Sequence, residues 1–499
     1  MECEALILLL SAVQCTLGLR FLTQIERFQW AVLQVDQLLF KNPNSLEDDI
    51  RNKLGTLPKD LKSSYDKIYR EITSAGSVLP VIANRAFQWV MCSCEPPSAS
   101  LLVAAVCRSP NQKNPTLVPH DMTIDYILQA CRNLLVFDPE LRVCQFSHLS
   151  VQEFEDCHWD IREVNASVAK FCLSLLNYSI LSDSPSETEH HPNGLLLDYA
   201  TLYWPNHIRN YGDKGDDHRL CALLKTFLGS INESGPAYRA WFRKYKRLSF
   251  SSKFLSLLDD ESELESYTLA SLPICYFGFC NILQDWWDDT GMDPNQQNSK
   301  GNSLIVLAIM GRSIQAIKKL LTLGANPNMK LMDRIHGSAL AAATGYDNAS
   351  GEMVRLLIDA GADVNAELTT GIYGSALAAA ANCGKRYIVR VLINAGADVN
   401  ARPSTGLYGS ALAAAAKNSK ANIVQLLVKS GAEVNAQLAF SSFGSALAAA
   451  VTSLAAPEES DSTVQLLIRA GADVNAKLKT GYYGSALAAA AHYGDPAPA

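Results

Sequence analysis

One histidine, His148, stands in the sequence FSHLS with a serine on each side and acidic residues nearby. A serine hydroxyl becomes a nucleophile when a neighbouring base takes its proton and a strained turn exposes it to the substrate. The chain contains no G-x-S-x-G sequence, which marks such a turn. Ser150 stands three residues before Glu153, and this spacing predicts a helix cap instead. We therefore expect no catalytic residue here and predict that the protein is not an enzyme.

Two other small groups contain residue types that bind zinc. They are Cys92 with Cys94, and Cys157 with His158. Residues two positions apart on a helix point in different directions, and no second ligand pair follows at the spacing of zinc sites. The thirteen cysteines are scattered without paired spacing. The sequence therefore predicts free structural thiols in a reducing compartment such as the cytoplasm, with neither a metal nor another cofactor.

The composition is that of a globular chain with more than one core. Its 499 residues are 48% hydrophobic and 19% charged, and its net charge of −7 offers no basic surface to nucleic acid. The apolar run at residues 5–13 is too short to span a bilayer. A buried helix is the favoured interpretation of this run. A secretory signal is the alternative, although Glu2 and Glu4 stand where a signal carries basic residues.

The clearest repeated element is the sequence GSALAAA, which begins at residues 337, 374, 409, 444 and 484. Thirteen residues before each copy stands the glycine of GANPN, GADVN or GAEVN. Serine before an alanine run predicts a capped helix, and the small alanine side chains let that helix pack closely against its neighbours. The expected caps are Ser375, Ser410, Ser445 and Ser485.

A second helix is predicted after each alanine helix. In YIVRVLINAG, the residues expected on its buried face are Ile388, Val391, Leu392 and Ala395. Gly396 follows and is expected to end the helix in a left-handed conformation. Two short antiparallel helices and a projecting finger, repeated every 35 to 40 residues in these copies, resemble the ankyrin repeat.

The resemblance to ankyrin repeats extends upstream. GNSLIVLAIMGRSIQAIKKLLTLGANPN and the divergent LASLPICYFGFCNILQDWWDDTGMDPNQQN each fit one unit, which gives about six units and a final half over residues 268–499. The half unit stops after its first helix, so we expect a truncated array. Trp286 and Trp287 in the divergent unit are expected to pack against the preceding helical region rather than to form a ligand platform.

Two sets of finger positions are candidates for binding a protein partner. The aromatic set directly precedes each GSAL and consists of Tyr373, Tyr408, Phe443 and Tyr483. These rings either contact a partner on the concave side, since Tyr is enriched in interfaces, or hold one finger against the next. The other set varies from copy to copy, as surface positions do, and consists of Glu367, Arg402, Gln437 and Lys477.

The first half of the chain lacks these repeats and has the pattern of helices. LPKDLKSSYDKIYREI places one apolar stripe at helical spacing, formed by Leu57, Leu61, Tyr65, Ile68 and Ile72. Between residues 79 and 160, three helices, one of them capped by Ser98, precede two strands joined at Asp138-Pro139-Glu140. This order of elements is the outline of a winged helix.

The same half carries a second resemblance. It is similar to the region that follows the NACHT module in fungal, ankyrin-bearing NLR-like proteins, through RFQWAVLQVDQL, LPKDLKSSYDKIY, ANRAFQWVMCS, VCQFSHLSVQEF and LLDYATLYWPNHIRNY. That region includes a winged helix of the GPI inositol-deacylase type. In the family, a NACHT ATPase is the switch and the repeats are the sensor. The phosphate-binding sequence G-x-x-x-x-G-K followed by Ser or Thr is absent here, so the ATPase role is not carried over.

We predict an all-α protein, with one small hairpin, in four parts. They are a helical segment at 1–78, a winged-helix-like domain at 79–160, a helical linker at 161–267 and ankyrin repeats at 268–499. The predicted function is non-enzymatic binding of a protein partner through the concave face and fingers, with no nucleic acid, membrane or small-molecule substrate. Two alternatives remain: a fragment of a longer NACHT NTPase switch protein, and a secreted ankyrin protein, which glycosylation at Asn348 would support.

Overall fold

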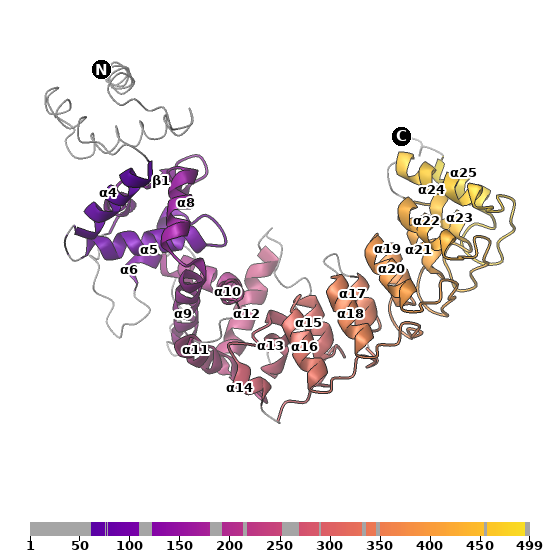
Figure 1. The fold of residues 1–499 in the computed structure, drawn as a ribbon, viewed down its shortest axis with the longest axis horizontal. Coiled ribbons are helices and arrows are strands. Elements are labelled where there is room, and N and C mark those ends of the chain that lie inside the picture. Colours follow the sequence, from indigo (N-terminus) through magenta and orange to yellow (C-terminus); the bar gives the residue numbers. More distant parts are fainter. Residues whose placement is uncertain are drawn as a thin grey trace, which may run out of the picture. The chain divides into compact units, whose positions relative to one another are not determined.

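The computed structural model divides the chain into two units, Met1–Phe227 and Leu228–Ala499. Within the described residues, helices predominate, and the strands form two short antiparallel hairpins, so the predicted all-α class is confirmed (Figure 1). None of the described helices has the length and apolar character of a membrane span. The apolar run at residues 5–13 lies outside the described residues, which are 61–74, 76, 78–108, 122–179, 192–212, 217–251, 269–288, 291–331, 336–345, 350–453 and 457–494.

The first unit packs its helices around aromatic and aliphatic side chains. Helix α4 (Leu61–Ser74) buries Tyr65, Ile68 and Ile72, as its spacing predicted, while Leu57 lies outside the described residues. The other elements are α5 (Leu79–Cys92), α6 (Ala99–Cys107), α7 (Ile124–Ala130), β1 (Leu135–Asp138), β2 (Val143–Phe146), α8 (Leu149–His158), α9 (Ile161–Ser179), α10 (Pro192–Tyr211) and α11 (His218–Leu228).

Strands β1 and β2 follow the helices α5, α6 and α7 and pair as an antiparallel hairpin, in which Leu135 faces Phe146. The carboxylate of Asp138 closes the turn, because its Oδ1 accepts the backbone N–H of Glu140 at 2.9 Å and of Leu141 at 3.0 Å. The strands therefore lie where the sequence predicted them. The predicted cap of α6 is confirmed as well, since Ser98 accepts a backbone N–H from the first turn at 3.2 Å.

The start of α8 differs from the prediction. The helix begins at Leu149, and His148 is its N-cap, because the Nδ1 of His148 accepts the backbone N–H of Ser150 at 3.0 Å. The hydroxyl of Ser150 lies 2.7 Å from the hydroxyl of Tyr65 and 2.9 Å from the same Nδ1. The predicted capping box of Ser150 and Glu153 is wrong, because an imidazole nitrogen serves as the capping acceptor and Ser150 instead links α8 to α4.

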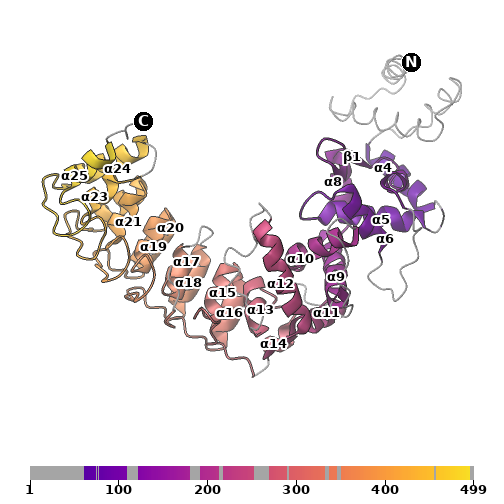
Figure 2. The ribbon, with the colours of Figure 1, turned by 180° about the vertical axis from the view of Figure 1, so that it is seen from behind.

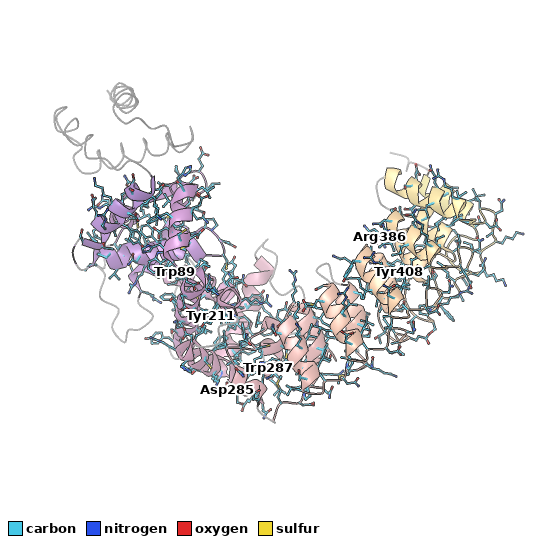
Figure 3. The ribbon with its side chains drawn as sticks, in the orientation of Figure 1. Trp89, Tyr211, Asp285, Trp287, Arg386 and Tyr408 are labelled. Carbon is cyan, nitrogen blue, oxygen red and sulfur yellow. The ribbon has the colours of Figure 1, made fainter. Side chains whose placement is uncertain are left out.

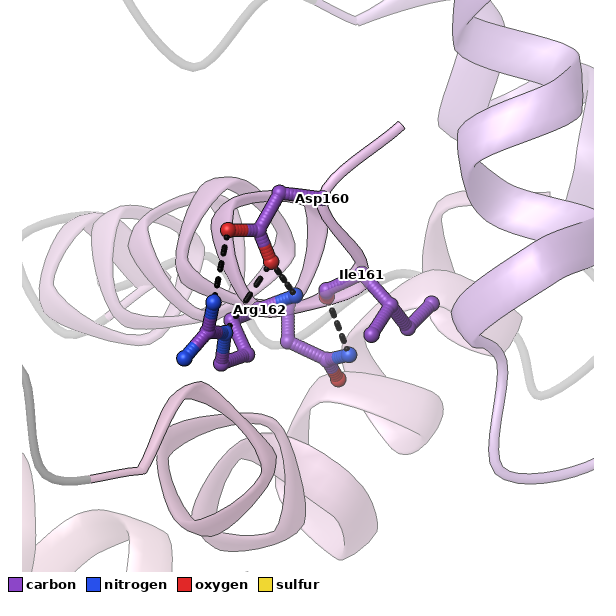
Figure 4. A network of polar contacts seen from close by, with 4 residues as sticks. Asp160, Ile161 and Arg162 are labelled. Atoms are coloured by element: carbon purple, nitrogen blue, oxygen red, sulfur yellow. Dashed lines mark hydrogen bonds and ion pairs between the residues drawn. The ribbon is translucent and has the colours of Figure 1, made fainter. Parts of the chain in front are cut away.

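A compact polar network begins α9 (Figure 4). The Asp160 carboxylate accepts the backbone N–H of Arg162 at 3.0 Å and also pairs with its guanidinium at 3.1 Å. One turn later, Asn165 donates to the carbonyl of Ile161 at 2.8 Å, and its Oδ1 lies 2.9 Å from the Nδ1 of His207 in α10. Burial lowers the pKa of His207 to about 4, so this imidazole is neutral at physiological pH.

The second unit begins with a minimal hairpin and a long helix. Trp241 in α12 lies edge-on to Phe277 in α13, with 6.4 Å between the ring centroids. Trp287 (Figure 3) is buried, as a packing role predicted. Trp286 is partly exposed. The elements here are β3 (Gly229–Ser230), β4 (Glu233–Ser234), α12 (Pro236–Ser251), α13 (Ser271–Phe277) and α14 (Gln284–Trp287).

Helix pairs follow, and the pairs stack side by side along the unit (Figures 1 and 2). First helices of successive pairs contact one another, and so do second helices. We call them inner and outer helices. The inner helices are α15 (Leu304–Met310), α17 (Ala339–Gly345), α19 (Ala376–Asn382), α21 (Ala411–Lys417), α23 (Ala446–Val451) and α25 (Ala486–Gly494). The outer helices are α16 (Ile314–Thr322), α18 (Gly351–Asp359), α20 (Arg386–Asn394), α22 (Ala421–Lys429) and α24 (Pro457–Arg469).

The alanine helices form the packing surface between pairs. Ala379 in α19 and Ala414 in α21 are completely buried. Small side chains let the inner helices approach closely enough for each to contact both of its neighbours. Each predicted cap accepts the backbone N–H three residues ahead at 3.1 or 3.2 Å, which confirms Ser375, Ser410, Ser445 and Ser485.

The outer helix α20 buries a stripe slightly different from the one predicted. Ile388 and Leu392 are buried as expected, but Val389 is the third buried residue. Val391 is only partly buried and Ala395 is exposed, because both lie at the edge of the buried stripe. Gly396 follows the C-cap with φ of +90°, which confirms its left-handed conformation.

Candidate functional site

Loops connect each outer helix to the next alanine helix, and we call them fingers. The fully described fingers are residues 361–375, 396–410, 431–445 and 471–485. Each begins at a glycine with φ between +87° and +91° and ends at the serine that caps the next helix. The helix pairs therefore hold every finger at the same place in successive repeats.

A row of asparagine side chains links each finger to the next. The Nδ2 of Asn365 donates to the carbonyl of Gly396 at 2.9 Å, and its Oδ1 accepts the backbone N–H of Asp398 at 2.7 Å. The same two bonds recur in the preceding repeat and in the following two, where they are made by Asn328, Asn400 and Asn435. We call this row the asparagine ladder. Our sequence interpretation missed it, although an asparagine ends every copy of the GADVN motif.

Backbone contacts also join the finger tips. The N–H of Leu407 donates to the carbonyl of Ile372 at 2.8 Å, and the N–H of Ser442 donates to the carbonyl of Leu407 at 3.2 Å. The series continues with the N–H of Tyr482, which donates to the carbonyl of Ser442 at 3.1 Å. Side chains at these positions therefore stand in one row across four repeats, directly before the predicted aromatic set.

The predicted aromatic set forms a stack between fingers. The rings of Tyr373 and Tyr408 are 6.5 Å apart and nearly parallel, and those of Tyr408 and Phe443 are 6.2 Å apart. Tyr373 is only 7% exposed. Burial raises the pKa of Tyr408, which Figure 3 labels. Tyr483 instead faces His492 of its own repeat at 5.4 Å. Of the two roles considered, holding one finger against the next is the one this geometry favours.

The predicted variable set is exposed at all four positions, and three of its members contact the next finger. Glu367 accepts the backbone N–H of Ser404 at 3.0 Å together with its hydroxyl, and these bonds lower the pKa of Glu367. Arg402 forms an ion pair with Glu433. Gln437 and Lys477, the remaining two members, contact each other, because the side-chain amide of Gln437 donates to the backbone carbonyl of Lys477 at 3.2 Å.

The most exposed apolar side chains of the fingers lie at their tips, and the sequence interpretation did not select them. Leu407 is 49% exposed, Phe440 is 63% exposed and Tyr482 is 78% exposed. We call these three residues the tip row. They belong to three successive fingers. The backbone series joins Leu407 to Tyr482 through Ser442, and Phe440 stands two residues before Ser442. Apolar side chains gathered into one exposed patch mark a protein-binding surface, and these three residues are the candidates for such a patch on the fingers.

The residues considered for catalysis or metal binding lie within the described part of the chain. No cluster of three metal-binding side chains occurs there. Cys92 is buried and Cys94 is exposed, and both are free thiols. His148 and Ser150 are engaged in the start of α8, as described above.

Comparison with known proteins identifies the helix pairs. Residues 349–438 match the family model for ankyrin repeats, in three copies, so the chain carries ankyrin repeats and with them a protein–protein interaction module. Among solved structures, the human ASB11 ankyrin repeat domain is 21% identical over 46% of this chain and 99% of its own, with a TM-score of 0.37. The ankyrin repeat domain of Bcl-3 is 26% identical over 44% of this chain and 92% of its own, with a TM-score of 0.35. No curated protein matches the chain.

Proposed function

We propose that the ankyrin repeats bind a protein partner through the finger tips, with the tip row as the apolar centre of the contact. The observation that carries this proposal is the exposure of Leu407, Phe440 and Tyr482 on fingers that are otherwise tied together. Burial of apolar side chains favours association, and tyrosine is enriched among the few residues that supply most of the binding energy of an interface. The finger framework keeps the row in place before a partner arrives, which lowers the entropy cost of binding.

The charged finger positions give the proposed contact a polar border. Glu367, Arg402 and Lys477 are exposed and carry both signs of charge. An apolar centre with a mixed polar rim is the usual composition of a reversible protein interface. The stacked rings of Tyr373 and Tyr408 support the fingers from below rather than contact the partner themselves.

A comparative pull-down tests the proposal. The full chain is used as bait in three forms: wild type, the double variant Leu407→Ser with Tyr482→Ser, and the control variant Ile468→Gln. Ser442 already occupies the position equivalent to Leu407 in the next finger, so serine is compatible with this backbone. Ile468 is 46% exposed on α24 and provides an equally apolar surface away from the tips.

We expect proteins that the wild type retains to be lost from the double variant and kept by the control. Equal retention by all three baits would contradict a role for the tips. Loss from both variants would also contradict it, because apolar exposure in general, and not the tip row, would then explain capture. Thermal unfolding of the three baits verifies that each is folded.

We propose in addition that the first half of the chain makes this a sensor of the NLR-like type, organised as 1–78, 79–160, 161–267 and 268–499. The support is the sequence resemblance together with the order of three helices and a hairpin between Leu79 and Phe146. The role is non-enzymatic. Saturable binding of ATP by the purified chain, or a phosphate loop encoded upstream in the full transcript, would favour the NTPase alternative instead.

A cytoplasmic location fits this role. Burial raises the pKa of the thiols of Cys131, Cys172 and Cys275 well above the usual range, so these cysteines serve as small apolar core residues. Such unpaired thiols suit a reducing compartment. Glycosylation of the native protein at Asn348 would contradict this location and favour the secreted alternative.

A further inference from the structure

A second surface lies on the outer helices, away from the fingers. Tyr387 stands at the start of α20 and is 45% exposed. The guanidinium carbon of Arg355 in α18 lies 5.4 Å from the centre of its ring, and that of Arg390 in α20 lies 6.0 Å from it. Arg386 precedes the tyrosine and is exposed (Figure 3). We call these four residues the arginine platform.

The fold makes room for the ring at the boundary between two repeats. A side-chain carbon at Gly351, the first residue of α18, would lie 2.2 Å from the ring of Tyr387. Because α18 and α20 are adjacent outer helices, the ring spans the junction and lies within reach of an arginine from each of them. A cation over an aromatic face is attracted by the ring electrons, so the tyrosine restricts both guanidiniums to one surface.

The positive charges of the platform are not neutralised within the described chain. Arg355, Arg386 and Arg390 form no ion pair there. The neighbouring carboxylate, Glu352, is paired with Lys318 of the preceding repeat at 3.0 Å. Like charges held together at a surface repel one another, and an anionic group bound between them relieves that repulsion.

The unpaired arginines occur in two successive repeats. Arg355 and Arg390 stand six residues before the glycine that begins the following finger. The preceding repeat has Lys318 at that position, where it is paired with Glu352, and the next two repeats have Gln425 and Gln465. Duplex nucleic acid carries phosphates along its whole length and requires a longer basic surface. A short run of carboxylates fits a patch of this size, because a planar guanidinium binds a carboxylate through two parallel hydrogen bonds.

We propose that the arginine platform binds an acidic peptide segment of a partner protein, through carboxylates on Arg355 and Arg390 and with Tyr387 beneath them. This surface is separate from the tip row, so one partner is contacted at two places or two partners bind at once. The platform adds charge selectivity to a repeat array whose finger contacts are mainly apolar.

Fluorescence anisotropy with the full chain tests the proposal. The probe is a fluorescein-labelled peptide of alternating Glu and Gly, and the matched probe has Gln in place of Glu. The test variant is Arg355→Gln with Arg390→Gln, which introduces the residue that the next two repeats carry at this position. The control is Lys429→Gln with Arg469→Gln, which removes the same charge from exposed positions on α22 and α24.

We expect the Glu peptide to bind the wild type and the control equally, and the test variant to bind it about fivefold or more weakly, since exposed guanidinium–carboxylate pairs are individually modest. A second variant, Tyr387→Asn, keeps both arginines and should weaken binding as well, because the ring no longer holds them. Added salt should weaken the binding of the Glu peptide.

Three outcomes would overturn the proposal. They are equal loss of affinity in the test and control variants, equal binding of the Gln peptide, and tighter competition by duplex DNA than by the Glu peptide. The tip-row variants leave the platform unchanged, so this experiment and the pull-down succeed or fail independently.

Discussion

The side-chain amide oxygen of Asn365 lies 2.7 Å from the backbone nitrogen of Asp398, thirty-three residues ahead in the sequence. Together with the bond from its amide nitrogen to the carbonyl of Gly396, this contact lets one side chain satisfy two backbone groups of the next repeat. The bonds run from finger to finger, whereas the alanine helices pack beneath them. Two independent sets of contacts therefore join each pair of repeats.

Replacing Asn365 by Ala removes both bonds. We expect the free energy of unfolding to fall by about 1–2 kcal/mol, since each net hydrogen bond is worth about 0.5–1.5 kcal/mol. The loss should appear in urea unfolding, and hydrogen exchange should increase in the fingers at 361–375 and 396–410. Asn475→Ala is the control, because Asn475 occupies the same position in the last described finger. Equal destabilisation by both changes would contradict the ladder.

Enlarging the buried alanines should strain the stack. Ala379→Leu and Ala414→Leu each add three carbon atoms where no space exists, and overpacking costs about 1–3 kcal/mol. In a repeat array, the damage should remain in the altered repeat and its neighbours, where hydrogen exchange detects it. Ala488→Leu is the control, because Ala488 is exposed on α25. Wild-type melting of both core variants would show that these helices do not set the spacing between repeats.

Gly396→Val tests the left-handed end of α20. A β-branched residue at φ of +90° should cost about 1–3 kcal/mol, and thermal melting measures this loss. Apart from the two adjacent residues, no atom lies within 4 Å of an added Cβ, so we expect the cost to arise from the backbone conformation. Ala395→Val places the same side chain one residue earlier, where φ is −84°. The assignment fails if the two variants melt together.

Glu155 should make the stability of the first unit depend on pH. Burial raises the pKa of this carboxyl from its ordinary value of 4.5 to about 7, and the neighbouring Trp159 donates to its Oε2 at 2.9 Å. The unfolded chain releases the proton first as pH rises. The contribution of Glu155 to stability is therefore complete below pH 4.5 and is lost progressively up to about pH 7.

Glu155→Gln should remove this dependence. Across the same pH range, the wild type should lose about 3 kcal/mol relative to the variant, because one unit of pKa corresponds to about 1.4 kcal/mol. Urea unfolding at a series of pH values measures the difference, and titrations shared by both proteins cancel. Parallel curves for the two proteins would mean that Glu155 ionises normally in the folded state.

The sequence predicted correctly those features of the fold that depend on residues close together in the chain. The caps at Ser375 and Ser98 and the left-handed Gly396 follow from local rules of helix ends, and all three were confirmed. The cap of α8 was assigned to Ser150 because serine is a common cap, whereas His148 performs this role once Tyr65 has engaged the serine hydroxyl. That contact joins residues far apart in the chain, so no local rule could reveal it.

The candidate site shows the same limit. The sequence gives the period of the repeats, and so it identifies equivalent positions, but it does not show which of them face solvent. Tyr373 and Leu407 are both apolar finger residues, yet the first is buried in a ring stack and the second is half exposed. The backbone bonds between tips decide this difference, and they form only once the repeats are stacked.

The asparagine ladder recognises only backbone atoms of the following repeat, namely a glycine carbonyl and an amide N–H. The side chain of the residue that donates this N–H does not affect the bond. Asp398 donates in one repeat and Glu433 in the next, at nearly the same distance. As far as these two bonds are concerned, any of these repeats can follow any other. Recombination between two copies in the gene would remove or add whole repeats and still leave these two bonds at every junction. The length of the array can therefore change in evolution without a new set of asparagine contacts.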